Sequence, residues 1–465
     1  MVTVETLPKD LRTIVIGNNR EYFAPLDSHI ASREQQEWVQ ADIDEADMDL
    51  MWLGDNKVVV LPSVVDPAFI GDIKKLMGFK KVQVLVPQPS TTHVSADLLN
   101  NPGDYNTLSE AIRNSARPNV VAWGHTPQFE RLVGRLKGDG LSFGTPETPL
   151  ERATWTPDYF DSKIGSRELL LAVQRKVDSF KVPEGFVCDT VGDAIRIARY
   201  FIESKRGVAF KANTGGAGAG IALLPPSEFT GDFAVNYKKI EDKLEENPLF
   251  QAGALIIEEY VPPDFRRFAT FPSVDTLVRP DGTVEVQSVD AMVIKHGEDG
   301  HVGFYGCLLG KGLYSNEEQR RLTRISERIG EQLYSYGYHG WFDTDYIFST
   351  DGRLFANECN VRRTSICYML DIGEVLFGEG FQDRLAMRSN DKYIGKNLSN
   401  LTYGQLKEIL GSLMFPMAEQ PKGVVITQSF RSMFGRGKFG YVVVGKDQEE
   451  AAKIERGLEK RLKRI

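Results

Sequence analysis

The sequence lacks the features that mark secreted and membrane proteins. None of its runs approaches the roughly 18 consecutive apolar residues of a transmembrane helix. Its N-terminus, MVTVETLPKDLR, does not have the basic and then apolar layout of a signal peptide. We therefore expect a cytoplasmic protein with no membrane partner.

Cysteine is scarce, and its spacing does not suggest a metal site. No CxxC pair occurs among the four cysteines, which are Cys188, Cys307, Cys359 and Cys367. This pattern argues against both a zinc site and a disulfide framework. We expect four reduced side chains packed in the core.

Positive charge is not in excess either. The chain has 56 lysines and arginines against 64 aspartates and glutamates, for a formal net charge of -8. A general nucleic-acid surface is therefore not expected. The one basic stretch, RGLEKRLKRI at the C-terminus, is interleaved with acids at helical spacing, which favours a solvated terminal helix.

Two common nucleotide-binding motifs are also absent. No GxGxxG follows the first predicted strand, TIVIGN, which weakens the case for a dinucleotide-binding domain. The glycine-rich stretch KANTGGAGAG is not a P-loop, because it lacks GK[ST] and because a strand, not a helix, follows it. A nucleotide site in this chain must be of another kind.

The patterns that are present indicate several domains of mixed α/β and α+β class. A chain of 465 residues is too long for one core. Residues 1 to about 155 alternate β-rich runs such as KVVVLPSVV with helical patterns such as AFIGDIKKLMGF, which favours a doubly wound parallel sheet. Residues 156–205 are mainly helical, and strands and hairpins dominate 207–360. Beyond about 395 the pattern is helix, strand, strand, helix.

The densest cluster of charge follows a predicted hairpin. The runs WFDTDYIF and RLFANECN are joined through STDG, and Asp-Gly between such runs indicates a two-residue turn. With Asp351 and Gly352 in the turn, Thr350 faces Arg353 and Ile347 faces Ala356. The same register makes Asp345 face Glu358 and Asp343 face Asn360. Because side chains alternate along a strand, these last four share one face, and Cys359 packs on the other.

Two carboxylates that face each other on a sheet repel. With Cβ atoms ~5 Å apart and an effective dielectric of ~20, the repulsion is roughly 3 kcal/mol. A shared proton, nearby arginines or a divalent cation can offset it, and oxygen ligands from Asp, Glu and Asn suit magnesium better than zinc. An exposed hairpin with its acids in water is the alternative.

A glycine-rich loop lies upstream of this hairpin. RGVAFKANTGGAGAGIALL is a strand that ends at Lys211, then a loop, then a second strand; the loop glycines are Gly215, Gly216, Gly218 and Gly220. Backbone amides of such a loop can approach phosphates closely, and Lys211 adds a cation at its entrance. The alternative is a flexible hairpin tip.

Two further segments fit around this loop. Lys163 and Arg167 are four residues apart and share a helix face, which can equally be a solvated face. ALIIEEYVPPDF is a buried strand that runs into two acids, an aromatic residue and two prolines. Such a strand exit can offer backbone groups to an adenine and an acid to a ribose, or it can simply end in a turn.

Taken in order, these parts resemble the ATP-grasp ligases over residues 160 to 375. The order is Lys163 with Arg167, then the strand to Lys211 with its glycine loop, then IIEEYV, then Asp345, then ECNVR. The spacing of 13 residues between Asp345 and Glu358 and the E-x-N-x-R pattern are similar to that family's metal and phosphate site. The layout looks most like peptide ligases with a pre-ATP-grasp domain, such as the pheganomycin-type ligase.

The resemblance implies three domains. They are a doubly wound pre-ATP-grasp domain at 1–155, an ATP-grasp domain at 156–394 with a glycine-rich lid at about 207–260, and a small α/β module at 395–465. Two positions of the family pattern stay open. Either Glu259 or Asp264 is the acid after the hinge, and RRTS follows the metal motif where proline or serine is common in the family.

The resemblance also implies an activity: ligation of a carboxylate to an amine through an acyl-phosphate, with ATP and Mg²⁺ as cofactors and release of ADP and phosphate. Arg362 and Lys211 would be catalytic, and Arg362 is ranked above Arg363, which points the other way on an extended chain. The implied metal ligands are Asp345, Glu358 and Asn360. The implied nucleotide contacts are Lys163, Lys211, Gly215, Gly216, Gly218, Glu258, Glu259, Tyr260, Val261 and Asp264.

Other outcomes and residues stay open at this point. A kinase or another carboxylate-activating enzyme would use the same nucleotide site, and a catalytically silent nucleotide-binding module is a third class. The expected partners are a small carboxylate and an amine, such as an amino acid or peptide, and a homodimer is possible. His125, His296, Arg266 and Arg267 are either substrate-side residues or ordinary loop and edge residues.

Overall fold

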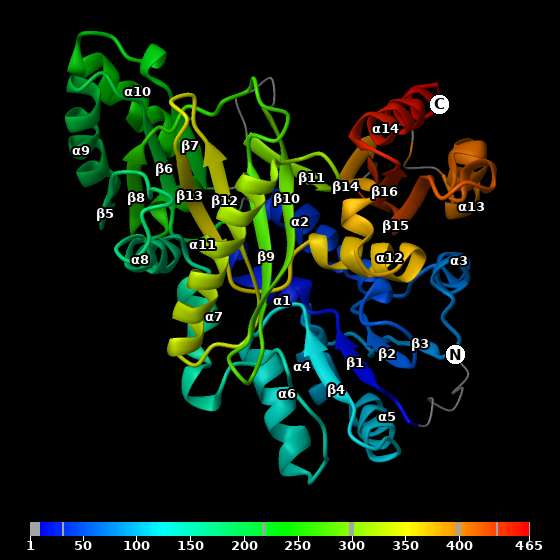
Figure 1. The fold of residues 1–465 in the computed structure, drawn as a ribbon. Coiled ribbons are helices and arrows are strands. Elements are labelled where there is room, and N and C mark those ends of the chain that lie inside the picture. The colour runs from blue at the N-terminus through cyan, green and yellow to red at the C-terminus, as the bar shows by residue number, and fades with distance from the viewer. Residues whose placement is uncertain are drawn as a thin grey trace.

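The computed structural model describes residues 10–464 except 30–31, 216–217, 219, 297–301, 396–397, 399–400 and 434–435. The strands of this part of the chain form three sheets, seen in Figure 1 as the blue and cyan, the green, and the central green-to-red layers. Together with the helices around them, they confirm the expected mixed α/β and α+β class.

The first sheet is parallel, with strand order β3-β2-β1-β4. Its strands are short and apolar because both faces of the sheet are buried: Val15 and Val59 pack into one hydrophobic core, and Ile14 and Val58 into another. The strands are β1 (Thr13–Ile16), β2 (Lys57–Val60), β3 (Val82–Leu85) and β4 (Asn119–Ala122). The helices are α1 (Asn19–Phe23), α2 (Ser32–Glu45), α3 (Pro67–Met77), α4 (Val94–Asn100), α5 (Pro102–Arg113) and α6 (Pro127–Gly138).

The order of this sheet reverses between β1 and β4, since β2 and β3 lie on one side of β1 and β4 on the other. Asn18, directly after β1, bridges to the loop after β4: its Nδ2 donates to the Gly124 oxygen at 2.9 Å. In open α/β sheets such a reversal, at the carboxyl ends of the strands, is where ligands bind.

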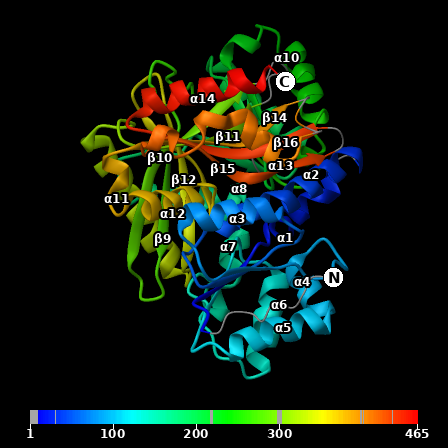
Figure 2. The same cartoon turned by 90° about the vertical axis from the view of Figure 1, so that its right-hand side faces the viewer.

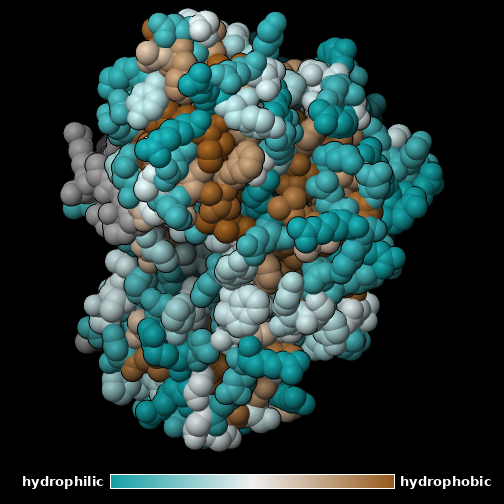
Figure 3. Space-filling view, turned by 90° about the vertical axis from the view of Figure 1, so that its left-hand side faces the viewer, coloured by the Kyte–Doolittle hydropathy of each residue, from teal (hydrophilic) through white to brown (hydrophobic). Residues whose placement is uncertain are grey.

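The second sheet is antiparallel, with order β5-β8-β6-β7, and the glycine-rich loop connects β6 to β7. One face packs on α9 and α10 through Phe201, Ile240 and Leu244. The elements are β5 (Gly185–Cys188), α9 (Val191–Glu203), β6 (Val208–Ala212), β7 (Ile221–Leu224), α10 (Phe233–Glu245) and β8 (Leu255–Glu259). Figure 3 shows the face that carries β5 and α9, where apolar side chains reach the surface among polar ones; Phe186 and Tyr200 are exposed there.

The third sheet has eight antiparallel strands in the order β13-β12-β9-β10-β11-β14-β16-β15. Its strands are β9 (Pro272–Val278), β10 (Val284–His296), β11 (Val302–Gly310), β12 (Gly340–Phe348), β13 (Leu354–Asn360), β14 (Ala386–Gly395), β15 (Gly423–Met433) and β16 (Arg436–Gly445). The strands after residue 395 therefore continue this sheet through β14, and Figure 2 shows them beside α14.

Helices cover both faces of the large sheet. Leu169 of α8 and Leu322 of α11 pack on one face with Tyr346, and Met369 of α12 shares a core with strands β14 to β16 and with the first sheet. These helices are α7 (Trp155–Phe160), α8 (Lys163–Gln174), α11 (Asn316–Ser335), α12 (Ile366–Phe377), α13 (Tyr403–Leu410) and α14 (Gln448–Leu462). Short 3₁₀ segments lie at Ala24–His29, Ala46–Met51, Glu151–Ala153, Pro226–Glu228, Pro248–Gln251, Phe381–Asp383, Gly411–Leu413 and Met417–Glu419.

All four cysteines are buried and unpaired, as expected from their spacing. Within the described ranges, no helix has both the length and the apolar character needed to span a membrane.

Candidate active site

The β12–β13 hairpin has a different turn from the predicted one. Gly352 N–H donates to the Ser349 oxygen and Ser349 N–H to the Arg353 oxygen, both at 2.9 Å, so the loop holds three residues rather than two. Gly352 has φ +82°, the left-handed conformation that closes such a loop at little cost for glycine. Near the turn, Ile347 therefore faces Phe355, and the predicted pairing with Ala356 is wrong.

A bulge restores the predicted pairing further along. The register shifts between Asp345 and Tyr346, with Asn357 as the extra residue on β13. Beyond it, Asp345 faces Glu358 and Asp343 faces Asn360, as predicted. Two offsets of one residue thus cancel. The bulge also directs Asn357 toward the glycine-loop strand, where its oxygens accept hydrogen bonds from Lys211.

The acidic face is larger than the sequence analysis predicted. Asp343 pairs with Asp275 on β9, and Ser273 stands between Asp345 and Asp290 of β10. These positions were missed, although polar residues two apart in the otherwise apolar PSVDTLV and QSVDAM are a signal for them. Four buried aspartates therefore lie on three neighbouring strands.

Burial dominates the electrostatics of this face. It raises the pKa of Asp345 to about 6 and that of Asp290 to about 7, because the charged form loses its solvation. The pKa values of Asp275 and Asp343 are raised well above the usual range, again by burial first and by neighbouring aspartates second. Asp345 Oδ1 and Asp290 Oδ2 are buried without a hydrogen-bond partner in the described chain.

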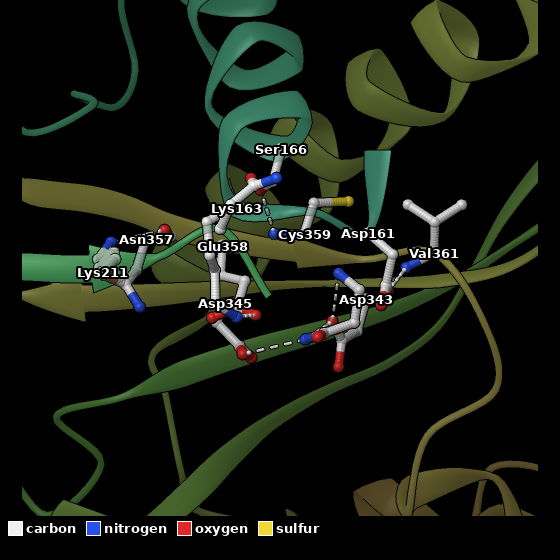
Figure 4. A network of polar contacts seen from close by, with 12 residues as sticks. Asp161, Lys163, Ser166, Lys211, Asp343, Asp345, Asn357, Glu358, Cys359 and Val361 are labelled. Atoms are coloured by element: carbon white, nitrogen blue, oxygen red, sulfur yellow. Dashed lines mark hydrogen bonds and ion pairs between the residues drawn. The ribbon is translucent and has the colours of Figure 1, made fainter. Parts of the chain in front are cut away.

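Lys163 approaches the same face from the first turn of α8. Its ammonium forms an ion pair with Glu358, shown in Figure 4. Burial lowers the pKa of Lys163 to about 8 even though acids surround it. The start of α8 is tied to the glycine-loop strand, because Lys163 N–H donates to the Asn213 oxygen at 3.0 Å and Ile164 N–H to Asn213 Oδ1 at 3.1 Å.

Lys211, at the end of β6, is buried and contacts Asn357. Its Nζ donates to the Asn357 Oδ1 at 2.9 Å and lies 2.6 Å from Glu258 Oε2. The other Glu258 oxygen accepts from Arg167 at 2.7 Å, and Arg167 also holds the Pro183 and Gly185 carbonyls. Lys163 and Arg167 share one face of α8, and both side chains are buried. Both Glu258 oxygens are held by protein groups.

The segment that follows β8 carries acidic, aromatic and apolar side chains. Glu259 pairs with Arg206 at 3.3 Å, and Asp264 with Arg266 at 2.7 Å. Tyr260 is half-buried and Val261 buried. Tyr260 N–H donates to the Gly207 oxygen, and Asp264 N–H donates to the Phe348 oxygen at 2.9 Å, so this segment runs from the second sheet to the end of β12.

The glycine loop is described only in part. Gly218 and Gly220 have φ values of +94° and +77°, which other residues rarely adopt. Gly215 lies at the start of the loop, and Gly216 lies outside the described residues. Ala212 N–H donates to the Gly220 oxygen at 2.8 Å, so the base of the loop is closed directly after Lys211.

Arg362 and Arg363 point to different places, as ranked from the sequence. Arg362 donates to Asn360 Oδ1 at 3.2 Å and lies 3.8 Å from Asp161, so it stays beside the acidic face. Arg363 forms a two-bond pair with Glu147 at 2.6 and 2.7 Å and lies against the rings of Trp52 and Trp341. Only Arg362 borders the candidate site.

The remaining candidates are less central. Arg266 is exposed beside Asp264, and Arg267 pairs with Glu318 under the ring of Phe348. His296 ends β10, and its side chain lies outside the described part of the structure. His125 is buried in the loop after β4, where burial lowers its pKa.

The acidic face offers oxygen donors to a metal ion. Among the described residues, no three His, Cys, Asp or Glu side chains converge in metal-binding geometry. The donor set Asp345, Glu358 and Asn360 consists of oxygens only, and Asp345 Oδ1 has no other partner in the part of the chain described. This chemistry fits a magnesium ion. With Lys163, Lys211 and Arg362 around it, the face can neutralise a polyphosphate.

Comparison with known proteins gives a family match and a curated relative. The family described as Pre ATP-grasp domain matches residues 48–137. The L-propargylglycine–L-glutamate ligase of Streptantibioticus cattleyicolor is 24% identical over 363 residues, which cover 72% of this chain and 69% of that protein.

Solved structures superimpose on nearly the whole chain. An L-amino acid ligase from Bacillus licheniformis superimposes with a TM-score of 0.53 at 11% identity and covers 98% of both chains. The biotin carboxylase domain of 2-oxoglutarate carboxylase from Hydrogenobacter thermophilus, solved with MgADP, ADP and bicarbonate, has a TM-score of 0.55 at 13% identity and covers 97% of this chain and 90% of that one. At such identities these matches speak for the fold. They confirm the resemblance seen in the sequence: a pre-ATP-grasp domain followed by the fold of the ATP-grasp ligases.

Proposed function

We propose that this chain, with its pre-ATP-grasp domain and ATP-grasp fold, is an ATP-dependent ligase that joins a carboxylate to an amine through an acyl-phosphate. The observation that carries the proposal is that Lys163 and Arg362 contact the face formed by Asp345, Glu358 and Asn360, while Lys211 contacts Asn357 next to Glu358. The curated relative is named for such a ligation, of an amino acid to glutamate, which supports the assignment.

ATP is the proposed nucleotide, placed between the second and third sheets. The backbone after β8, at Tyr260 and Val261, would meet the base, and Glu259 or Asp264 the ribose. Lys163 and Lys211 would lie along the phosphates; their ammonium groups are buried against Glu358 of the third sheet and Glu258 of the second. Gly215, Gly216 and Gly218 would close over the phosphates and keep water away from the intermediate.

Magnesium is the proposed metal, held by Asp345, Glu358 and Asn360. When bound, it would draw charge from the phosphate oxygens of ATP. In the structure the charge of Glu358 is offset by Lys163 instead. We infer that nucleotide and metal bind together, because each replaces one partner of this buried pair: the phosphates take Lys163, and the metal takes Glu358.

The proposed reaction has two steps at the same site, transfer of a phosphoryl group to the carboxylate and transfer of the acyl group to the amine. A carboxylate oxygen attacks the γ-phosphorus of ATP, and the bond to the ADP oxygen breaks. The amine next attacks the carbonyl carbon, the bond to the phosphate oxygen breaks, and phosphate leaves with the electron pair and takes up the proton that the amine nitrogen loses. Arg362 would hold the transferred phosphoryl group and then the oxyanion, a role supported by its hydrogen bond to Asn360 beside the acidic face.

We also propose the division into domains at 1–155, 156–394 and 395–465. The change from the parallel first sheet to the antiparallel sheets supports the boundary near 155. The boundary at 394/395 falls at the end of β14, and the strands of the last unit, β15 and β16, extend the large sheet rather than form a separate layer.

The test is a screen of the purified protein with ATP and magnesium against amino acids and short peptides. We expect ADP and phosphate in equal amounts and a condensed product by mass spectrometry. Arg362→Ala should abolish product formation, and Arg328→Ala, at an exposed arginine of α11, should not. Release of AMP and pyrophosphate would show adenylation instead. A phosphorylated product without condensation would show a kinase, and no ATP turnover would leave a binding module.

A further inference from the structure

A small cavity has Arg362 in its wall. Five separate segments of the chain line it: the end of β4 with α6, residues 147–149, Pro157 of α7, the start of β12 with the residues just before it, and residues 361–363. Its volume of about 20 Å³ exceeds the roughly 10–15 Å³ that one water molecule needs, so it can admit a small group at the end of a substrate but not a whole amino acid.

The cavity adjoins the carboxyl end of β4, beside the point where the order of the first sheet reverses. Trp123, Gly124 and His125 directly follow β4 and contribute to its wall. By the general rule for open α/β sheets, ligands bind at such an edge. Its position and the presence of Arg362 in its wall thus connect the first sheet to the reacting groups.

The lining is rich in unused hydrogen-bond donors. Trp123 Nε1, Trp341 Nε1 and Arg362 Nε are buried N–H groups with no hydrogen-bond partner in the described structure. Both ring nitrogens of His125 are also unpartnered, the nearer contact being Glu130 at 3.8 Å from Nε2. Trp123 and His125 are only 5% and 8% exposed, so bulk water does not satisfy them.

The number of donors identifies the ligand chemistry. A single water molecule can accept two hydrogen bonds, fewer than the three N–H groups of Trp123, Trp341 and Arg362. A carboxylate has about four acceptor positions, and its charge is favourable beside a guanidinium. The charge of Arg363, the other arginine in the wall, is already paired with Glu147.

We propose that this cavity binds the carboxylate of the acid substrate and presents it to the reacting centre at Arg362. The inference rests on the proposed function, because the group held here is the one to be phosphorylated. Trp123 and Trp341 act as binding residues for that carboxylate. His125 supplies a further donor from one ring nitrogen.

The test removes the N–H donor of Trp123 and keeps an aromatic ring at that position. Trp123→Phe retains an aromatic side chain of related shape and loses the N–H. Binding is measured by calorimetry without turnover, with acetate, the free protein amino acids and the matching amino acid amides as probes, each with and without a non-hydrolysable ATP analogue and magnesium. Trp155→Phe is the matched control, because Trp155 is 46% exposed and outside the cavity.

We expect at least one carboxylate to bind the wild-type protein and its amide to bind much more weakly. Trp123→Phe should weaken that carboxylate by about tenfold or more, as for a hydrogen bond to a charged group, and leave ATP affinity unchanged. Trp341→Phe should act in the same direction, which keeps the test decisive if one variant does not fold. The Trp155→Phe control should match the wild type.

Three results would overturn the assignment: no carboxylate binds the wild type, acid and amide bind equally, or both cavity variants bind the carboxylate normally. These failures differ from failure of the proposed function. Normal ADP release and unchanged KM for the acid in Trp123→Phe would refute the cavity alone. Loss of ADP release in the wild type would refute the ligase, while the binding measurement needs no turnover.

Discussion

Two buried ion pairs connect the large sheet to distant parts of the chain, Arg363 with Glu147 and Lys163 with Glu358. In the first pair both carboxylate oxygens accept bonds, and the guanidinium lies between Trp52 and Trp341. In the second, the neighbouring Asp345 has an oxygen without a partner among the described residues, and its pKa is raised to about 6 by burial.

The difference separates an architectural contact from one that can exchange partners. A complete pair with stacked rings has nothing to gain from a ligand. A pair surrounded by like charges and unpartnered atoms can be replaced by a metal and a phosphate at lower cost. Substitutions in and around the two ion pairs test this contrast.

The largest effect should come from removing the architectural pair. Glu147→Ala leaves the Arg363 charge buried without its partner, which costs about 3–5 kcal/mol of folding free energy. We expect a clear fall in the midpoint of thermal unfolding by circular dichroism. Glu130→Ala, at an exposed glutamate of α6, is the control. An unchanged midpoint would show that the pair is not architectural.

Removing one charge from the exchangeable pair should mainly affect activity. Glu358→Gln keeps the shape but loses the charge that would hold the metal, and a loss of about 10²–10³ in turnover is expected. Stability should change less than in Glu147→Ala, because the substitution relieves repulsion with Asp345 and because Lys163, with a pKa of about 8, can lose its proton. Steady-state ADP release at several magnesium concentrations and the unfolding midpoint test both statements. Normal turnover at low magnesium would contradict the metal assignment.

Lys211 should show a smaller effect that is confined to the nucleotide. Lys211→Ala removes a charged phosphate contact of roughly 1.5–3 kcal/mol, or about 10- to 150-fold in ATP affinity. Calorimetric titration with the non-hydrolysable analogue measures it, and Lys239→Ala, at an exposed lysine of α10, is the comparison. Equal ATP affinity in both variants would remove Lys211 from the phosphate site.

The smallest effect, counted per pH unit, concerns the pH dependence of stability. The pKa of Asp290 is about 7 in the fold, above the usual value of 3.8, so the folded state binds the proton more tightly than the unfolded state. Stability is then lost as pH rises from about 4 to about 7, at no more than about 1.4 kcal/mol per pH unit. Asp290→Asn should flatten this slope in denaturant titrations at pH 5 and pH 7. A slope identical to that of the wild type would show that Asp290 is charged in both states.

Part of the site could be predicted because it depends on local patterns. The alternation of WFDTDYIF and RLFANECN placed Asp345 with Glu358 on one face and Cys359 on the other, and the structure agrees. That agreement involved a compensation, since a three-residue turn and a bulge at Asn357 offset each other. Sequence patterns do not reveal such a bulge, because it is stabilised by contacts such as the one between Asn357 and Lys211.

Asp275 and Asp290 were missed for a related reason. β9 and β10 are consecutive strands that pair with each other, and each aspartate alone resembles an ordinary polar position on a half-exposed strand. Their effect arises only because β12, which is distant in sequence, pairs with β9 and brings Asp343 and Asp345 to the same part of the sheet. Burial then raises the pKa values of Asp275 and Asp290 and turns a polar row into an acidic face.

The sequence by itself determined the kinds of elements, the order of the ATP-grasp parts and which of Arg362 and Arg363 borders the acids. Alternation, turn residues and motif spacing act over a few residues, so they can be recognised in one chain. Only the tertiary structure decided which charges are satisfied. Lys163 and Glu358 are 195 positions apart and Arg363 and Glu147 216 apart, so whether each pair is complete depends on packing that brings distant segments together and excludes water.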